Sequence, residues 1–266
     1  MKKIKDTDYL YLSSYLHAKE ARREENAENK ADVYRELSMK APDPQIVDFF
    51  RIKYDYHNAK VYLKSVAAGE DNSHLFLSLG RYSPAVLTEA CRTEDYRSLS
   101  KDFAAALRES SETLGRTTDP RLADFILDRA YVKELKDTAE KTGSEFLLGY
   151  AALYADALNL RALVRMLKSS VRPEQLKNVL TDCGSVRSSS VSSAYPDVNS
   201  VLALYRGTKL APSLPDAERA VKGEGFTPFE RAVQSCLDGY MEKAKYTGFG
   251  ENVLIRYLYM IEEQST

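Results

Sequence analysis

The spacing of apolar residues along the chain follows the period of an α-helix. The stretch after Asp119 is the clearest case, because apolar residues recur there every three or four positions and charged residues mostly fall between them. Its apolar stripe comprises Leu122, Phe125, Ile126, Ala130 and Leu135. No segment has the sustained strict alternation that is typical of a strand, so we expect an all-α fold.

Prolines mark where several of these helices begin. Each follows a residue that caps helices well, and its missing N–H costs nothing in the first turn. The pairs are Asp43-Pro44, Ser83-Pro84, Asp119-Pro120 and Thr227-Pro228, and Glu230 completes a capping box with Thr227. We expect Gly143 to end one helix and Ser144 to begin the next. The predicted helices are 8–22, 30–40, 44–68, 84–91, 95–114, 119–142, 144–170, 174–182, 197–206, 215–222, 228–246 and 250–264.

Two stretches interrupt the helical pattern. The segment from Cys183 to Pro196 is rich in serine, and we interpret it as a polar surface loop rather than a flexible linker. The charge-rich run from Arg22 to Lys30 is typical of a solvated helix end or crossing.

Composition narrows the class of protein. Lys and Arg number 38 against 39 Asp and Glu, which argues against a broadly basic surface for nucleic acid. No apolar run is long enough for a membrane span, and the basic start at Met1 has no apolar core behind it, so we expect neither a span nor a secretory signal. Cys91, Cys183 and Cys236 lack metal-ligand spacing, which favours reduced thiols in a cytoplasmic compartment.

Two helical segments repeat the same polar residues 101 positions apart. The matched positions are Asp55, Asn58, Lys60 and Lys64 in the first segment, and Asp156, Asn159, Arg161 and Arg165 in the second. An Asp and an Asn three residues apart share one helix face. Since the second segment is apolar on nearly every side, its Asp and Asn are expected to be buried and to need partners, such as a nearby arginine. A structural network is the favoured interpretation, and a functional site is the alternative.

A third copy of this helix is predicted at Gly250–Gln264, which ends where a third polar pair would fall. Repeated helical units indicate a duplicated scaffold. We expect a single domain over 1–266 with approximate units 1–114, 115–184 and 185–266.

The sequence offers little catalytic chemistry. It has no phosphate-binding glycine loop, no serine-nucleophile elbow and no His-Glu-x-x-His zinc motif. His57 is a weak candidate for a general base, because Leu158 stands at its place in the second copy. We therefore expect no catalytic residue, cofactor or metal.

Several blocks along the chain have a familiar order: Asp8-Tyr9-Leu10-Tyr11-Leu12-Ser13, Val47 to Lys60, Asp119 to Tyr131, Asp156 to Arg161, Phe229-Glu230-Arg231-Ala232, Tyr246 to Glu251, and Ile255-Arg256-Tyr257-Leu258. Taken together, these blocks resemble the V-type ATPase C-subunit family, known as the d subunit in eukaryotes, and its bacterial and archaeal V/A-type members in particular. Family members usually carry more helix after the position of Arg23 and beyond that of Thr266, so we expect segments at these points to be deleted or left out of the sequence.

The resemblance implies a funnel-shaped assembly of three similar helical units that is not an enzyme. It implies a rotor component on the cytoplasmic side of the membrane, a socket between a central shaft made of the D and F subunits and the membrane ring. Such a socket links ATP-driven rotation to proton or sodium transport. Phe249, Gly250 and Glu251 are the expected contact region. The alternatives are a helical scaffold for another soluble protein and an all-helical hydrolase or lyase with an acidic cleft.

Overall fold

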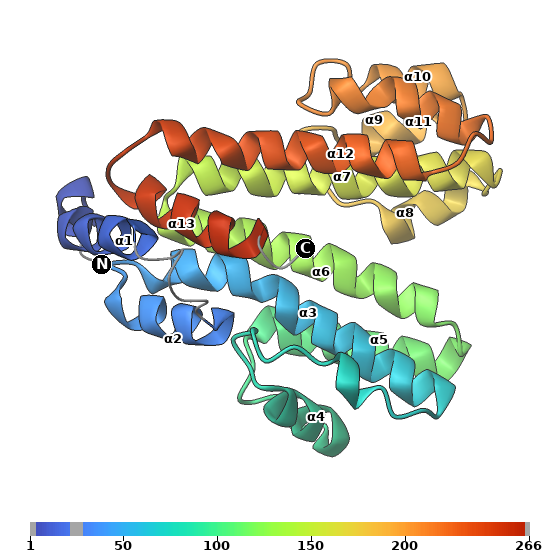
Figure 1. Cartoon of the computed structure of the whole chain (residues 1–266). Helices are drawn as coiled ribbons and strands as arrows, with labels where there is room; N and C mark the ends of the chain where they lie inside the picture. Colours follow the sequence, from blue (N-terminus) through green and yellow to red (C-terminus); the bar gives the residue numbers. More distant parts are fainter. Residues whose placement is uncertain (1–3, 22–28, 264–266) are drawn as a thin grey trace. The chain divides into compact units, whose positions relative to one another are not determined.

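The computed structural model describes residues 4–21 and 29–263, which fold into helices joined by turns and loops (Figure 1). No strand occurs among these residues, so the all-α prediction is confirmed. Most of the charge-rich run from Arg22 to Lys30 lies outside the described residues. The α-helices are α1 (Leu10–Ala21), α2 (Lys30–Lys40), α3 (Pro44–Ala68), α4 (Pro84–Thr93), α5 (Lys101–Thr117), α6 (Pro120–Thr142), α7 (Glu145–Lys168), α8 (Leu176–Val179), α9 (Ser188–Ala194), α10 (Val198–Ala203), α11 (Leu214–Val221), α12 (Thr227–Met241) and α13 (Glu251–Glu263). Short 3₁₀ turns are η1 (Asp6–Tyr9), η3 (Ser73–Leu75), η4 (Pro173–Gln175), η5 (Ala211–Ser213) and η6 (Glu242–Tyr246).

Three of the predicted proline-marked helix starts are capped as expected. The Asp43 side chain accepts from the Gln45 N–H at the start of α3, and Asp119 does the same for Arg121 in α6 (3.0 Å each). Ser83 caps α4 through the Val86 N–H (3.3 Å). These caps satisfy amides that have no partner inside the helix.

The capping box predicted at Thr227 is wrong. Helix α12 already includes Thr227, and the Glu230 N–H donates to the Phe226 carbonyl (2.9 Å). The Glu230 carboxylate instead accepts from Arg161 and Arg165 on α7. Glu230 therefore forms ion pairs with another helix in place of the predicted local hydrogen bond.

Helix α5 begins later than its apolar pattern suggested. It starts at Lys101 rather than near residue 95, and the Ser100 side chain caps it through the Phe103 N–H (3.4 Å). Upstream, Asp95 binds the side chain and the backbone of Arg97 in a turn. Such side-chain bonds to a local backbone compete with helix.

The serine-rich segment predicted as a loop contains helix α9. The Ser192 and Ser193 hydroxyls donate back to the carbonyls of Ser188 and Ser189 one turn earlier, so serine is compatible with the helix here. Fully buried Val191 anchors the helix to the core of its unit. The loop prediction for 183–196 is therefore wrong over 188–194.

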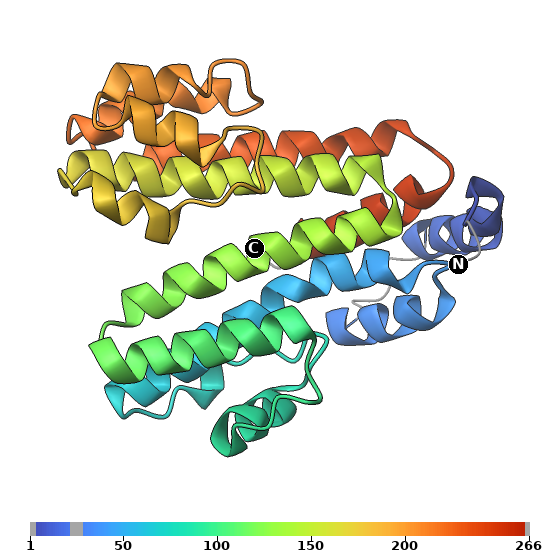
Figure 2. The ribbon, with the colours of Figure 1, turned by 180° about the vertical axis from the view of Figure 1, so that it is seen from behind.

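The chain forms two compact units, of which the first comprises residues 1–144 and 242–266. Its central helix is α3, which runs beside α6 and also packs against α2, α4, α5 and α13 (Figures 1 and 2). Helix α1 packs against α13. Fully buried side chains from these helices fill the core, among them Ile46, Ile52, Phe103, Leu107 and Leu127.

The second unit comprises residues 145–241 and is built around α7. Helices α11 and α12 pack along α7, and α10 contacts α11. Ala151, Leu160 and Leu163 of α7 are fully buried, as are Phe229 and Val233 of α12. In each unit, then, the helix that carries an Asp-x-x-Asn pair is the central one.

Candidate functional site

Asn58 and Asn159 each hold a loop by the same pair of hydrogen bonds. On α3, the Asn58 amide donates to the Leu77 carbonyl (2.8 Å) and accepts from the Leu77 N–H (2.9 Å). On α7, Asn159 makes the same reciprocal pair with Thr181 (2.8 and 3.0 Å). Both asparagines are fully buried, so these bonds satisfy groups that would be costly to leave unpaired.

Asp55 holds the first of these loops at a second point. Its carboxylate accepts from the Tyr82 N–H (3.2 Å) and from the Arg81 guanidinium at Nε (2.6 Å). We call residues 77–82 the first anchored loop. Because Asn58 and Asp55 lie one turn apart on α3, the loop is fixed at both ends to one helix face.

Asp156 holds the second loop in the same way, but without an arginine. Its carboxylate accepts from the Val186 N–H (3.0 Å) and from Ser185, through both the N–H (3.1 Å) and the hydroxyl. We call residues 181–186 the second anchored loop. The expected arginine partner is wrong for Asp156, since a serine and backbone amides supply all of its hydrogen bonds in the described part of the chain.

A glycine lets each loop approach its aspartate. A Cβ atom on Gly80 would lie 2.3 Å from Asp55 Oδ1, and one on Gly184 would lie 2.1 Å from Asp156 Oδ1. Neither distance is compatible with a side chain. Only glycine fits at these two positions.

The residues that contact the Asp-x-x-Asn pair have the same spacing along the chain in both loops. They are Leu77, Gly80, Arg81 and Tyr82 in the first loop, and Thr181, Gly184, Ser185 and Val186 in the second. The glycine is the one identity among them, and the second loop follows its helix at a distance three residues longer. Sequence reasoning did not predict how either loop is anchored, and the glycine was the signal that could have indicated it.

Arg81 extends the first site to helix α6. Its Nη1 donates to Glu134 (2.8 Å), which also accepts from the hydroxyls of Tyr56 (2.9 Å) and Ser100 (2.8 Å). Burial raises the pKa of Asp55 from 3.8 to about 6, although the Arg81 guanidinium opposes that rise. The first copy is thus a buried cluster of two carboxylates and one guanidinium.

The repeated cations make equivalent bridges between helices. On α3 the bridges to α6 are Lys60–Asp128 (2.5 Å) and Lys64–Asp124 (3.0 Å). On α7, Arg161 and Arg165 both reach Glu230 of α12 (2.7 and 2.8 Å). The charge match seen in the sequence therefore corresponds to matched pairing of neighbouring helices.

Glu262 occupies the equivalent place on α13, as many residues from its helix start as the two anchoring aspartates. It holds no loop. Its carboxylate accepts from the hydroxyls of Tyr34 and Tyr54 and from the ammonium of Lys53, and Lys30 lies at 3.2 Å. Burial opposes ionisation, but Lys53 and the hydroxyls lower the pKa of Glu262 overall. The carboxylate thereby joins α13 to α2 and α3.

The three residues of the predicted contact region have different surroundings. Phe249 is 61% exposed, whereas Gly250 is buried, and a Cβ there would lie 2.4 Å from Asp6 Oδ1. Glu251 accepts from the Ser144 hydroxyl. Tyr246, in the same turn, is 88% exposed.

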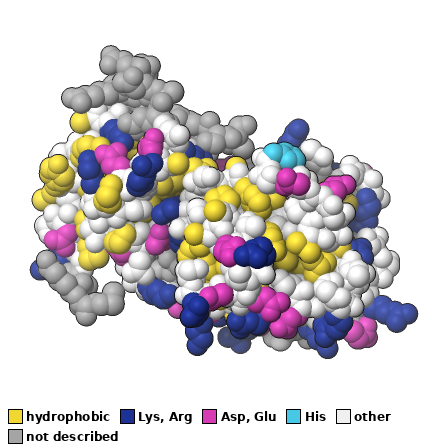
Figure 3. Space-filling view, turned by 90° about the horizontal axis from the view of Figure 1, so that it is seen from below, with side chains coloured by type: hydrophobic (Ala, Val, Ile, Leu, Met, Phe, Trp, Pro, Cys, Tyr) yellow, Lys and Arg dark blue, Asp and Glu magenta, His cyan; other side chains and the backbone are white. Residues whose placement is uncertain are grey.

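On the face shown in Figure 3, charged side chains of both signs are interspersed with apolar ones.

The sequence as a whole matches a known family. The family described as ATP synthase (C/AC39) subunit aligns with residues 1–263. The chain belongs to this family. A curated relative, the C subunit of a V-type sodium ATPase from Enterococcus hirae, is 24% identical over 242 residues, which cover 90% of this chain and 73% of the relative. The resemblance to the V-type ATPase C-subunit family is thus confirmed.

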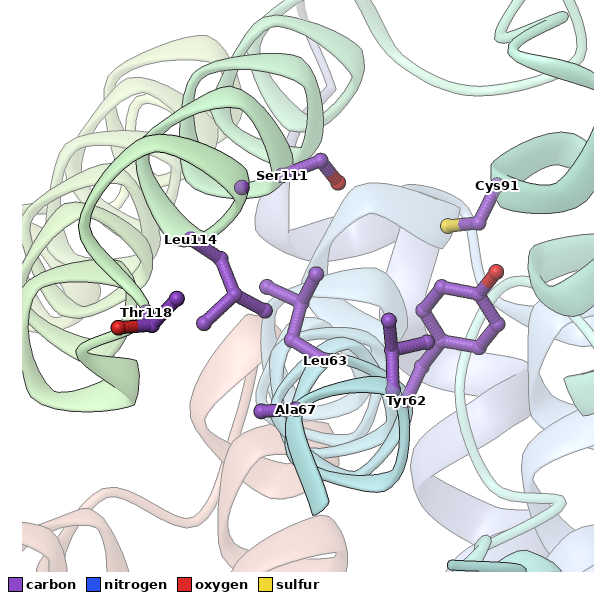
Figure 4. Close-up of a pocket in the computed structure, with 9 residues that line it drawn as sticks. Tyr62, Leu63, Ala67, Cys91, Ser111, Leu114 and Thr118 are labelled. Atoms are coloured by element: carbon purple, nitrogen blue, oxygen red, sulfur yellow. The ribbon is translucent and has the colours of Figure 1, made fainter. Parts of the chain in front are cut away.

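An apolar cavity lies among the described residues of the first unit. It measures about 400 Å³ and lies between α3, α4 and α5, where Tyr62 and Leu63 face Cys91 and Leu114 (Figure 4). Burial raises the pKa of the Cys91 thiol to about 12, so the thiol stays protonated and is a poor nucleophile. The described residues that line this cavity carry no charge.

A metal site, a membrane span and a catalytic histidine would each need a particular arrangement of residues in the described part of the chain. No group of three or more His, Cys, Asp or Glu side chains there is arranged to hold a metal ion. No helix in the same residues is long and apolar enough to cross a membrane. His57 binds the Leu75 carbonyl through Nε2 (3.1 Å) at an exposed position.

Proposed function

We propose that the chain is a non-catalytic rotor component of a V/A-type ATPase. In this proposal it is a socket that couples a central shaft made of the D and F subunits to the membrane ring, so that ATP-driven rotation is linked to proton or sodium transport. The observation that carries the proposal is the family match over residues 1–263. The ATPase named for the curated relative is a sodium ATPase, which makes sodium a candidate ion here.

The internal bonding of the chain is consistent with a mechanical role. A torque-transmitting part needs long helices that keep their register under load. Here Lys60 and Arg161 bridge neighbouring helices, while the Asp-x-x-Asn pairs hold loops against the central helices. Close packing of the buried faces adds stiffness. We propose that these pairs serve a structural role.

We propose further that the chain lies on the cytoplasmic side of the membrane, as a peripheral part of the membrane complex. Its contacts in that place would be with the D–F shaft and the ring, and no nucleic acid takes part. The three-unit funnel remains a prediction from the resemblance.

The contact region is proposed to centre on Phe249. Its exposed ring, together with that of Tyr246, is the kind of aromatic group that dominates protein interfaces. Gly250 and Glu251 would act by shaping the turn, since Gly250 has a left-handed backbone (φ 67°) against Asp6. Residues 246–251 form one short segment that runs from the end of η6 to the start of α13.

The test is co-elution of the full chain with a purified D–F pair on a sizing column, followed by titration. We expect a three-part complex, and Phe249→Ala should weaken it by about 2 kcal/mol, or roughly 30-fold in Kd. Met39→Ala is the matched control, because Met39 is 76% exposed on α2 of the same unit. Absence of any complex would contradict the proposal and favour a scaffold for another protein. Equal effects of the two variants on the Kd would contradict only the assignment of Phe249 to the contact region.

A further inference from the structure

The first anchored loop contacts more of its unit than the second does. Through Arg81 it reaches Glu134 on α6, and through Tyr82 it reaches the start of α5, where the Ser100 N–H donates to the Tyr82 hydroxyl (2.8 Å). The Ser100 hydroxyl closes the circuit by donating to Glu134 (2.8 Å). A single chain of hydrogen bonds therefore joins α3, the loop, α5 and α6.

Burial makes this circuit costly to open. The side chain of Asp55 is fully buried, and those of Glu134 and Arg81 are 7% and 14% exposed. Moving the loop away would separate the guanidinium from both carboxylates and leave charge buried without a partner. The loop and the two helices should therefore open together or not at all.

The second anchored loop lacks this extension. Ser185 stands where the first loop has Arg81, and its hydroxyl ends at Asp156. In the described chain, the other hydrogen bonds of the loop that involve side chains join Val186 to Asp156, Thr181 to Asn159, Cys183 to Thr181 and Ser188 to Asp182. None of them reaches α11 or α12. Local opening there breaks the bonds that Asp156 and Asn159 of α7 make to the loop, but no bond to a further helix.

We propose that Arg81 makes the first anchored loop a joint that couples α3, α5 and α6 into one cooperative body, whereas the second anchored loop is held to α7 alone. The two loops share one bonding pattern, and the presence of Arg81 in the first and Ser185 in the second distinguishes a unit-wide joint from a local one. This inference concerns the chain by itself and does not depend on the proposed partners.

Hydrogen exchange followed by mass spectrometry on the full chain tests the difference. Gly80→Ala and Gly184→Ala are matched perturbations, because each drives a Cβ into an anchoring aspartate. In Gly80→Ala we expect exchange to rise about tenfold over 77–82 and also over α5 and α6. In Gly184→Ala a similar rise should stay within 181–186, with α11 and α12 unchanged.

Two control variants separate this effect from general loosening. Gly115→Ala in α5 and Gly239→Ala in α12 place a Cβ in open space, so neither should raise exchange above that of the parent chain. The proposal is overturned if Gly80→Ala affects only its own loop, or if Gly184→Ala loosens α11 and α12 to the same degree.

A milder variant keeps the test decisive if Gly80→Ala does not fold. Glu134→Gln removes one charge at the α6 end of the circuit, and we expect faster exchange of the remote Leu77 and Tyr82 amides. Its counterpart, Glu230→Gln, breaks the bridge between α12 and α7 and should leave the Thr181 and Val186 amides unchanged. Unchanged exchange at Leu77 and Tyr82 in Glu134→Gln would refute the coupling.

Discussion

The first and second anchored loops share a backbone framework but are stabilised by different surroundings. In the first loop Leu77 is 38% exposed, and a buried ion cluster around Arg81 holds the loop to the helices. In the second, Thr181 is 9% exposed and Val186 7%, and no ion pair is present among the described bonds of the loop. The two loops thus share the anchoring bonds, while buried charge stabilises the first and apolar burial the second.

The largest expected effect comes from breaking the ion cluster in the first copy. Arg81→Met leaves Asp55 and Glu134 buried without a cation, which should lower the free energy of unfolding by about 3–5 kcal/mol. Urea denaturation measures this through the midpoint. Arg97→Met is the control, because Arg97 is 90% exposed and pairs with Asp95 at the surface, so its midpoint should not move. Similar midpoints for both variants would contradict the buried-cluster account.

The second copy should depend on Asp156 through its hydrogen bonds. Asp156→Ala leaves the N–H groups of Ser185 and Val186 without acceptors, at about 1–3 kcal/mol for each group that stays buried. Thermal unfolding should show a lower melting temperature. An unchanged melting temperature would refute the structural role of this aspartate.

A smaller effect is expected from crowding the second loop. Gly184→Ala pushes a Cβ against Asp156 and should destabilise the chain by about 1–3 kcal/mol. Gly239→Ala, in an open helical position, should instead stabilise it by about 0.5–1 kcal/mol. Changes of opposite sign in the free energy of unfolding of the two variants would support the comparison. Equal changes would show that Gly184 has no special contact.

These contrasts show which features local sequence determines. Asp43 and Asp119 cap their helices through bonds to the next turn, so sequence alone predicted them. The buried Asp-x-x-Asn positions were visible because they repeat on apolar helices. Glu230 misled the capping prediction, since its partners Arg161 and Arg165 come from a different helix.

The loop partners were beyond the reach of sequence reasoning. Leu77 and Thr181 are bound through backbone atoms, which any residue type supplies, so their identities carry no signal. Arg81 and Glu134 are far apart in sequence and meet only because α3 and α6 run side by side. Serine content indicated a loop over 183–196, but burial of Val191 favoured helix α9.

The smallest predicted effect is a pH dependence that arises from Asp55 in the first copy. Burial raises the pKa of Asp55 to about 6, so between about pH 4 and 6 the folded chain binds more protons than the unfolded chain. The contribution of Asp55 to the free energy of unfolding therefore falls as pH rises through this window and is level above it. Asp55→Asn removes the titrating group. Urea unfolding at about pH 4.5, 5.5 and 7 should show the parent chain losing stability relative to this variant as pH rises, and the opposite slope would contradict the assignment.

The most direct test of the socket proposal is a bridging measurement. Purified membrane ring is immobilised in detergent, and the D–F pair is applied with and without the full chain. The account predicts that the shaft is retained on the ring only when the chain is present, in a complex that contains all of these components. Retention of D–F without the chain, or failure of the chain to bridge them, would contradict a socket role.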